Sequence, residues 1–224
     1  MNGRVFLAGG GGPEDSQPLD VEFARAVGGG PLSYWPVAME PDRHAECQAW
    51  IHQVFDPLGV RDIRMWTGEE ELSLPDYRGI YIGGGNTYRL LSLVRRWGLL
   101  EPLRAYVAAG GVVLGGSAGA ALLGADINTV AHLDRNDVKL TETGGADLAA
   151  GHGIFVHHRD SDLPREMVWA ATYHRPVLAL TERANVIVSG NAVTAVGPEP
   201  ALVVTPGGRR KLAPGTTSYA GSPA

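Results

Sequence analysis

The chain contains a single cysteine, Cys47, and this scarcity limits its chemistry. A lone thiol excludes an internal disulfide bond and any zinc site built from cysteines. Long apolar runs are also absent, because no stretch approaches the length that crosses a membrane. The apolar start at residues 5–8 is too short for a signal peptide. We therefore expect a soluble, cytoplasmic protein without a membrane partner.

Basic residues do not gather into a long run. The net charge is −5, and the one basic cluster, Arg209-Arg210-Lys211, lies beside glycines near the C-terminus. Nucleic-acid-binding proteins normally present a basic patch, so this charge balance argues against a nucleic-acid partner. Repeats and linkers are absent as well. We expect one α/β domain over residues 1–224, with a loose Gly/Pro/Ser/Thr-rich tail from about residue 213.

Short apolar runs alternate with helical patterns along the first half of the chain. Predicted strands lie at residues 5–8, 32–39, 63–66, 80–82 and 112–114, and predicted helices at 20–27, 44–58, 87–96 and 99–109. This alternation favours a three-layer α/β fold with a mostly parallel central sheet flanked by helices. Further strands are predicted at 154–156 and 177–180, a helix at 163–173, and an antiparallel meander over 186–189, 192–196 and 201–205.

The segment Gly115-Gly116-Ser117-Ala118-Gly119 follows an apolar run and precedes a short helical stretch at 118–123. A strand, a sharp turn and a helix with this spacing are typical of a nucleophile elbow, which exposes a serine hydroxyl at its tip. Two more glycine-rich loops, at 9–12 and 83–85, follow predicted strands. Because ligands bind at the carboxyl ends of parallel strands, the three loops predict one shared site.

A serine needs a base to take its proton. His157 and His158 directly follow the predicted strand at 154–156, and side-chain alternation allows only one of them to face Ser117. A carboxylate should orient that imidazole. Glu182, after the strand at 177–180, is the candidate, and Asp134, Asp137 and Asp160 compete with it.

The Gly83-Gly84-Gly85-Asn86 loop has two interpretations. Its glycines allow the backbone to approach a reacting carbonyl, so the N–H groups of Gly85 and Ala118 could form an oxyanion hole. The alternative is a strand-to-helix turn in which Asn86 is the N-cap. Dinucleotide and P-loop phosphate patterns are absent, and adjacent histidines on a strand chelate metal poorly, so we expect neither a cofactor nor a metal ion.

The chain resembles the peptidase E group of serine peptidases, the aspartyl dipeptidases, which are related to the cyanophycinases. The resemblance lies in the segments at residues 82–91 and 116–120. It implies a class I glutamine-amidotransferase-like (flavodoxin-like) fold with Ser117 as nucleophile. It favours His158 over His157 as the base. Cyanophycinase-like members match Glu182 as the acid, whereas peptidase E itself has an aspartate between serine and histidine, for which Asp134 is the nearest candidate.

We therefore expect a serine peptidase, an exopeptidase or dipeptidase acting on short peptides, with aspartate at the scissile bond as one preference that the resemblance implies. Ser117, His158 and Glu182 form its expected triad. The expected substrate-binding residues are Gly84, Asn86 and Arg159. Two alternatives stay open, a cyanophycinase-like hydrolase of aspartate–arginine isopeptides and a non-catalytic protein that binds a small ligand. The sequence leaves the oligomeric state open, a homodimer included.

Overall fold

Eight strands form the central sheet of the computed structural model, which describes residues 3–220. In spatial order they are β12 (Thr217–Tyr219), β9 (Ala192–Ala195), β8 (Asn185–Ser189), β1 (Arg4–Ala8), β5 (Val112–Gly116), β4 (Gly79–Ile82), β2 (Leu32–Trp35) and β3 (Ile63–Met65). Neighbouring strands pair in parallel across β1, β5, β4, β2 and β3. On the other side of β1, the strands β8, β9 and β12 extend the sheet with antiparallel pairs.

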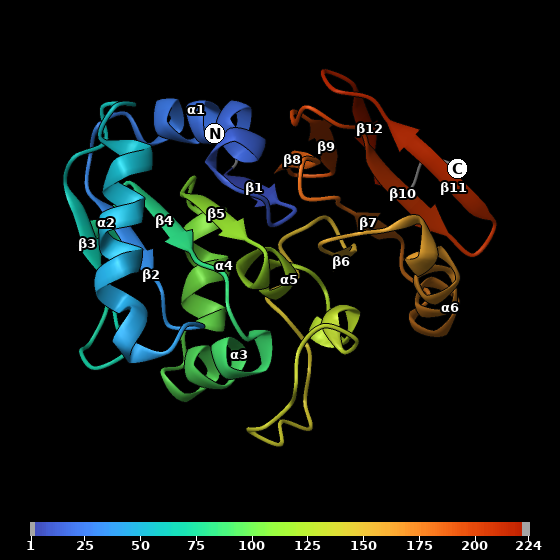
Figure 1. Cartoon of the computed structure of the whole chain (residues 1–224), viewed down its shortest axis with the longest axis horizontal. Helices are drawn as coiled ribbons and strands as arrows, with labels where there is room; N and C mark the ends of the chain where they lie inside the picture. Colours follow the sequence, from blue (N-terminus) through green and yellow to red (C-terminus); the bar gives the residue numbers. More distant parts are fainter. Residues whose placement is uncertain (1–2, 221–224) are drawn as a thin grey trace.

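Helices cover both faces of this sheet and make it the middle of three layers (Figure 1). On one face, α1 (Pro13–Val27) and α2 (His44–Phe55) bury Phe23 and Phe55 against β1 and β4. On the other face lie α3 (Thr87–Arg96), α4 (Leu100–Ala108) and α5 (Ala118–Leu123). Strands buried on both faces read as continuous apolar runs, which is why β1 and β5 were visible in the sequence. The predicted α/β fold is confirmed.

A second, four-stranded sheet lies beside the first (Figure 1). Its order is β11 (Gly208–Leu212), β10 (Ala201–Thr205), β7 (Val177–Ala179) and β6 (Gly153–Phe155), and α6 (Leu163–Tyr173) packs on it. The predicted meander is therefore wrong in part, because β8 and β9 belong to the large sheet and β10 to the small one. Four residues of β10 are buried, and β10 pairs with β7 on one side and β11 on the other. It is therefore an inner strand of the small sheet.

Several predicted boundaries change. Helix α1 begins at Pro13 and not at residue 20, directly after the loop at 9–12. Strand β2 ends at Trp35, because Pro36 has no N–H group to continue the ladder. Residues 217–219 of the tail expected to be loose form β12, which pairs with β9. Residues 221–224 lie outside the described part of the chain. Short 3₁₀ turns occur at Pro41–Arg43, Leu74–Asp76, Ile127–Val130 and Asp160–Asp162.

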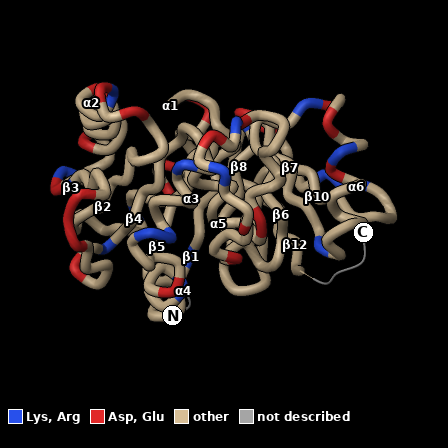
Figure 2. The backbone as a smooth tube through the Cα atoms, turned by 90° about the horizontal axis from the view of Figure 1, so that it is seen from below, with Lys and Arg blue, Asp and Glu red and all other residues tan. Residues whose placement is uncertain are grey.

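Charged residues of opposite sign lie close together along the backbone (Figure 2). Arg43 pairs with Glu46 and Arg64 with Asp62, each at 2.9 Å on the exposed surface. Such exposed pairs contribute only about 0–1 kcal/mol each, so the apolar layers carry the stability of the fold. Within residues 3–220, no helix has both the length and the apolar character that a membrane span requires.

Candidate active site

Three loops meet where neighbouring parallel strands end. Strands β1 and β4 both pair in register with β5, up to Gly116 and Gly115 respectively. The following segments therefore leave the sheet side by side: residues 9–12, 83–86 and 117–119. Their closeness is measurable, because a Cβ atom added to Gly84 would lie 3.4 Å from Ser117 Cβ. The three glycine-rich loops thus border one common site.

Ser117 stands at the tip of a sharp turn between β5 and α5. Its backbone has φ 51° and ψ −109°, an unfavourable conformation for a side-chain-bearing residue. Its N–H group donates to the carbonyl oxygen of Ala8, 3.1 Å away. A Cβ atom on Gly119 would lie 2.1 Å from the Ile82 carbonyl oxygen, so only glycine permits α5 to pass so close to β4. The strand, sharp turn and helix predicted from the sequence are observed, with Ser117 at the tip of the turn.

His157 lies beside this serine. Its Nε2 atom is 2.8 Å from Ser117 Oγ, and its Nδ1 atom is 3.2 Å from Glu182 Oε1. The imidazole ring packs directly against the backbone of Gly10, where a Cβ atom would lie 2.3 Å from His157 Cε1 and exclude the ring. The His157 N–H group donates to the Gly9 carbonyl oxygen at 3.0 Å and fixes the backbone at this point. Serine, histidine and glutamate thus form a hydrogen-bonded chain.

His158, which the resemblance favoured, does not lie beside Ser117. Its Nδ1 atom is 2.6 Å from Glu166 Oε1 on α6. The two side chains are 3% and 0% exposed, so the pair is shut inside the small layer. Buried polar groups are stable only when they are partnered, and this pair gives α6 a polar anchor on the loop after β6. The expected Ser117–His158 contact is therefore wrong, and His157 occupies that place.

Backbone geometry explains why His157, and not His158, lies beside Ser117. Phe155 packs in the α6 layer and Val156 in the main core, as alternation along β6 requires. Continued alternation would turn His157 toward α6 and His158 toward the main core. His157 instead has φ 52°, which breaks the extended conformation and reverses both directions. The local sequence does not predict a left-handed backbone conformation at position 157, because the residue is histidine and not glycine.

Glu182 and Asp134, the two acids that the family resemblance offers, occupy different places. Glu182 follows β7 and reaches His157, with 63% of its side chain exposed. Asp134 instead accepts a hydrogen bond from the Thr87 N–H group through Oδ2 at 2.7 Å, at the start of α3. This contact caps α3 and ties the loop at 131–135 to it. The geometry therefore pairs the histidine with Glu182 and gives Asp134 a capping position.

The expected substrate-binding residues differ in what they contact. Asn86 is the N-cap of α3: its Oδ1 atom accepts from the Arg89 N–H group, and its Nδ2 atom donates to the Arg135 carbonyl oxygen, both at 2.9 Å. Asn86 thus already uses both ends of its side chain within the fold. Arg159 is exposed beside a polar cleft of about 330 Å³ that also borders His157. Its backbone N–H group donates to Asp162 Oδ2 and its carbonyl oxygen accepts from the Asp162 N–H group, whereas its side chain has no hydrogen bond among residues 3–220.

Three backbone amides near Ser117 are available to a ligand. Ala118 is the first residue of α5, where a helix offers its N–H group no internal acceptor. Within the described residues, the N–H groups of Gly84 and Gly85 likewise have no acceptor in the fold. These free donors lie in the two loops that flank the Ser117 side chain. They are suited to an oxyanion.

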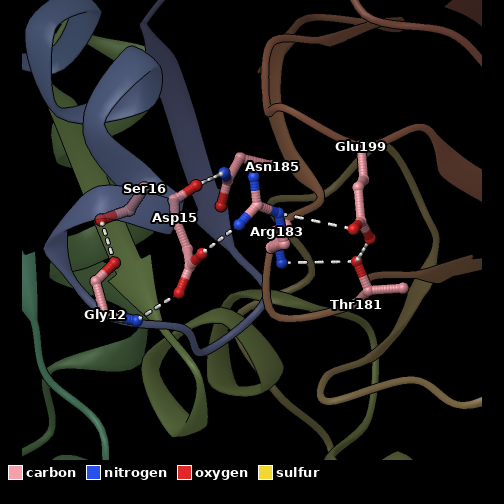
Figure 3. Close-up of polar contacts among 7 residues, drawn as sticks. All are labelled: Gly12, Asp15, Ser16, Thr181, Arg183, Asn185 and Glu199. Atoms are coloured by element: carbon pink, nitrogen blue, oxygen red, sulfur yellow. Dashed lines mark hydrogen bonds and ion pairs between the residues drawn. The ribbon is translucent and has the colours of Figure 1, made fainter.

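A network that the sequence did not suggest holds the turn bearing Glu182 (Figure 3). The hydroxyl of Thr181 donates to Glu199 Oε2 at 2.8 Å. Arg183 Nη1 donates to Asp15 Oδ1 at 3.2 Å, and its Nε atom is 3.4 Å from Glu199 Oε1. Both neighbours of Glu182 are therefore tied down by their side chains.

The same network reaches the start of α1 (Figure 3). The Asp15 carboxylate accepts a hydrogen bond from the Gly12 N–H group at 3.0 Å, and its carbonyl oxygen accepts one from Asn185 Nδ2 at 2.9 Å. A capping interaction of α1 thus connects the loop at 9–12 to the turn at 181–183. The His157 ring rests against Gly10 of that loop. Asp15 lies 168 residues from Arg183, so no local pattern could reveal the contact.

A buried carboxyl group lies one helical turn further along α1. Ser16 Oγ donates to Asp20 Oδ2 at 2.7 Å. Asp20 is 3% exposed, and burial raises its pKa to about 7, an effect that the Ser16 hydrogen bond partly offsets. Burial also raises the pKa of the nearby Tyr81 hydroxyl, and the Asp20 charge adds to this effect. A Cβ atom on Gly116 would lie 3.0 Å from the Tyr81 hydroxyl oxygen, so this polar cluster borders the strand end that carries Ser117.

Sequence comparison identifies the family. The pattern of Peptidase family S51 matches residues 5–196. The chain belongs to this family. The resemblance to peptidase E, stated from residues 82–91 and 116–120, is therefore confirmed. The elbow and the Gly83–Asn86 loop of this S51 protein both lie inside the matched range.

Curated relatives align with parts of this S51 protein. Peptidase E of Citrobacter koseri is 34% identical over 97 residues, 43% of this chain and 34% of that protein. Peptidase E of Shewanella sp. (strain W3-18-1) is 40% identical over 75 residues, 34% of this chain and 30% of that protein. A pyridoxal 5'-phosphate synthase subunit PdxT from Desulforudis audaxviator is 33% identical over 56% of this chain and 58% of its own. The chain thus spans about a third to three fifths of these relatives.

Solved structures show the same fold over nearly the whole S51 chain. A putative peptidase E protein from Listeria monocytogenes EGD-e superposes with a TM-score of 0.70 at 21% identity, covering 88% of this chain and 99% of that one. A peptidase from an acI-B1 Actinobacterium gives 0.72 at 17% identity, covering 98% and 97%. The expected three-layer, glutamine-amidotransferase-like fold is confirmed by these likenesses.

Proposed function

We propose that this S51 protein is a serine peptidase that hydrolyses short peptides, acting as an exopeptidase or dipeptidase. Ser117 is the nucleophile, His157 the general base and acid, and Glu182 the group that orients His157. One observation carries the proposal: the serine Oγ, both imidazole nitrogens and a glutamate oxygen form one chain, with distances of 2.8 and 3.2 Å. Such a chain is what a serine needs to become a nucleophile.

The reaction follows from this arrangement. Glu182 accepts a hydrogen bond from His157 Nδ1–H, which leaves the Nε2 lone pair free to take the Ser117 proton. The serine oxygen attacks the scissile carbonyl carbon, and the N–H groups of Gly85 and Ala118 stabilise the oxyanion. His157 then gives its proton to the departing amine. In the second half, His157 takes a proton from water, the resulting hydroxide attacks the acyl carbon, and His157 returns the proton to Ser117 Oγ as the bond between this oxygen and the acyl group breaks.

The test uses a small fluorophosphonate, which reacts with an activated serine whatever the peptide preference. We expect labelling of the wild-type protein and none of Ser117→Ala, with Ser189→Ala, an exposed serine at the end of β8, labelled normally. Hydrolysis of a dipeptide panel should fall at least about 10³-fold in Ser117→Ala. Labelling that persists in Ser117→Ala would assign the reactive hydroxyl to another serine, and no labelling of the folded wild type would favour a non-catalytic role. Either result contradicts the proposal.

A further inference from the structure

A pocket of about 240 Å³ lies between α2 and the loops that follow β2 and β4. Gly84 forms part of its wall, and a Cβ atom on Gly84 would come within 3.9 Å of Ser117 Oγ. The pocket is therefore next to the nucleophile. Its volume equals that of about eight water molecules in the liquid, which leaves room for one large side chain.

The order of the strands decides which part of a peptide this pocket meets. Across the sheet the order is β1, β5, β4, β2. His157 hydrogen-bonds to the loop after β1, Ser117 follows β5, and the pocket lies over the ends of β4 and β2. The histidine and the pocket are thus on opposite sides of the serine. This placement does not depend on which peptide binds.

The chemistry assigns the two sides. Under the proposed function, on which this inference rests, His157 Nε2 protonates the departing amine. The leaving part of the peptide must then lie on the His157 side of Ser117. The residue that supplies the scissile carbonyl lies on the other side, so the pocket faces the side chain of this acyl residue.

The inner walls of the pocket are aromatic and sulfur-containing. Tyr34 is 3% exposed and packs against Trp50, with ring centroids 6.4 Å apart, and Cys47 and Met39 complete this part. Burial raises the pKa of the Tyr34 hydroxyl and of the Cys47 thiol, so both groups are neutral at pH 7. These walls offer apolar surface and no charge.

The remaining lining residues are an ion pair. Arg43 Nε and Nη2 donate to the two carboxylate oxygens of Glu46 at 3.0 and 2.9 Å. This two-bonded pairing leaves the pocket with no net charge. A substrate carboxylate would have to leave water, lie against Trp50 and compete with Glu46 for Arg43. An uncharged side chain gains from the same apolar walls.

We propose that this pocket is the specificity site for the acyl residue and that it selects a large uncharged side chain, such as leucine, methionine or phenylalanine, over aspartate. Burial of one such side chain corresponds to an advantage of about 10- to 100-fold in kcat/KM over aspartate. This choice differs from the aspartate preference that the family resemblance implies.

The experiment compares Leu-Ala, Met-Ala, Phe-Ala, Asn-Ala and Asp-Ala with the wild type, Trp50→Ala and Arg43→Gln. Asn-Ala has nearly the shape of Asp-Ala without its charge. We expect the apolar peptides to be cleaved best and Asp-Ala worst. Trp50→Ala should lower kcat/KM for Leu-Ala and Phe-Ala by about tenfold or more, while fluorophosphonate labelling of Ser117 keeps its rate. Met39→Gln, another lining residue in the loop after β2, tests the same point if Trp50→Ala is unstable.

Three outcomes overturn the inference. Preferred cleavage of Asp-Ala that disappears in Arg43→Gln means that Arg43 binds a substrate carboxylate. A peptide preference unchanged in both Trp50→Ala and Met39→Gln means that the pocket does not bind substrate. These two results leave Ser117 labelling intact and so leave the proposed function standing. Loss of labelling and of all peptide cleavage in the folded wild type removes the proposed function and this inference together.

Discussion

Replacing His158 by leucine removes one member of a pair that is closed off from water. Glu166 is 0% exposed, and its second oxygen, Oε2, has no hydrogen-bond partner among the described residues. Without His158, its first oxygen loses its partner too. Breaking a buried pair from one side costs about 3–5 kcal/mol. For a chain of this size, each kcal/mol lowers Tm by about 2–4 °C, so we expect a fall of about 6–20 °C.

Replacing His157 by alanine should have the opposite profile. The His157 side chain is 31% exposed and rests on Gly10 at the surface of the site. Its loss should change stability by less than about 1 kcal/mol, as is usual for a partly exposed side chain outside the core. Removal of the general base should slow fluorophosphonate labelling of Ser117 and peptide hydrolysis by about 10²- to 10⁴-fold.

The assay measures thermal unfolding and the labelling rate for both variants side by side. A third protein, His158→Leu with Glu166→Leu, serves as control, because two apolar residues can replace a buried pair without the unpaired group. It should recover most of the lost stability and label at nearly the wild-type rate. A stable His158→Leu protein that no longer labels, together with a His157→Ala protein that does, would refute this reasoning and return the base to His158.

Three further changes test other parts of the site. In Gly10→Ala, the new Cβ atom would lie 2.3 Å from His157 Cε1, so the ring must move and labelling should slow by about 100-fold; an unchanged rate contradicts the packing argument. Arg183→Met removes the contacts that hold the turn carrying Glu182, so we expect kcat to fall severalfold with little change in KM and a narrower pH range of activity. Arg183→Lys should recover part of the activity. A change in stability alone would mean that the network has only a structural role. The pKa of Asp20 is about 7 in the folded protein and about 3.9 in an unfolded chain. The contribution of Asp20 to the free energy of unfolding is therefore fully present below about pH 4 and is lost as the pH rises through 7, in total about 4 kcal/mol. Asp20→Asn should remove this slope in urea unfolding between pH 5 and pH 8, and a slope that persists in the variant assigns it to another group.

Local patterns were enough to locate the elbow and the loops around it. The glycines about Ser117 are there because α5 passes within contact distance of β4, and a side chain at Gly119 would overlap the Ile82 carbonyl. That constraint acts over a few residues and therefore leaves a recognisable spacing. The buried parallel strands were equally readable, since burial on both faces demands an apolar run.

Contacts between distant segments were not readable in this way. The histidine that faces Ser117 depends on one positive φ angle at His157, which the Gly9 and Gly10 backbone and Glu182 hold in place. The division of the C-terminal strands between two sheets depends on where α6 packs. Such choices are made by surfaces that meet only in the folded chain.

The sequence alone thus determined an α/β protein with a serine at a strained turn, because turn chemistry and apolar periodicity are local properties. The tertiary structure decided which histidine and which acid join that serine. Ser117, His157 and Glu182 follow three different strands, and their side-chain directions are set by packing, by the capping contact of Asp15, and by the buried His158–Glu166 pair. The pocket beside Gly84 likewise forms where α2 lies against the ends of β2 and β4.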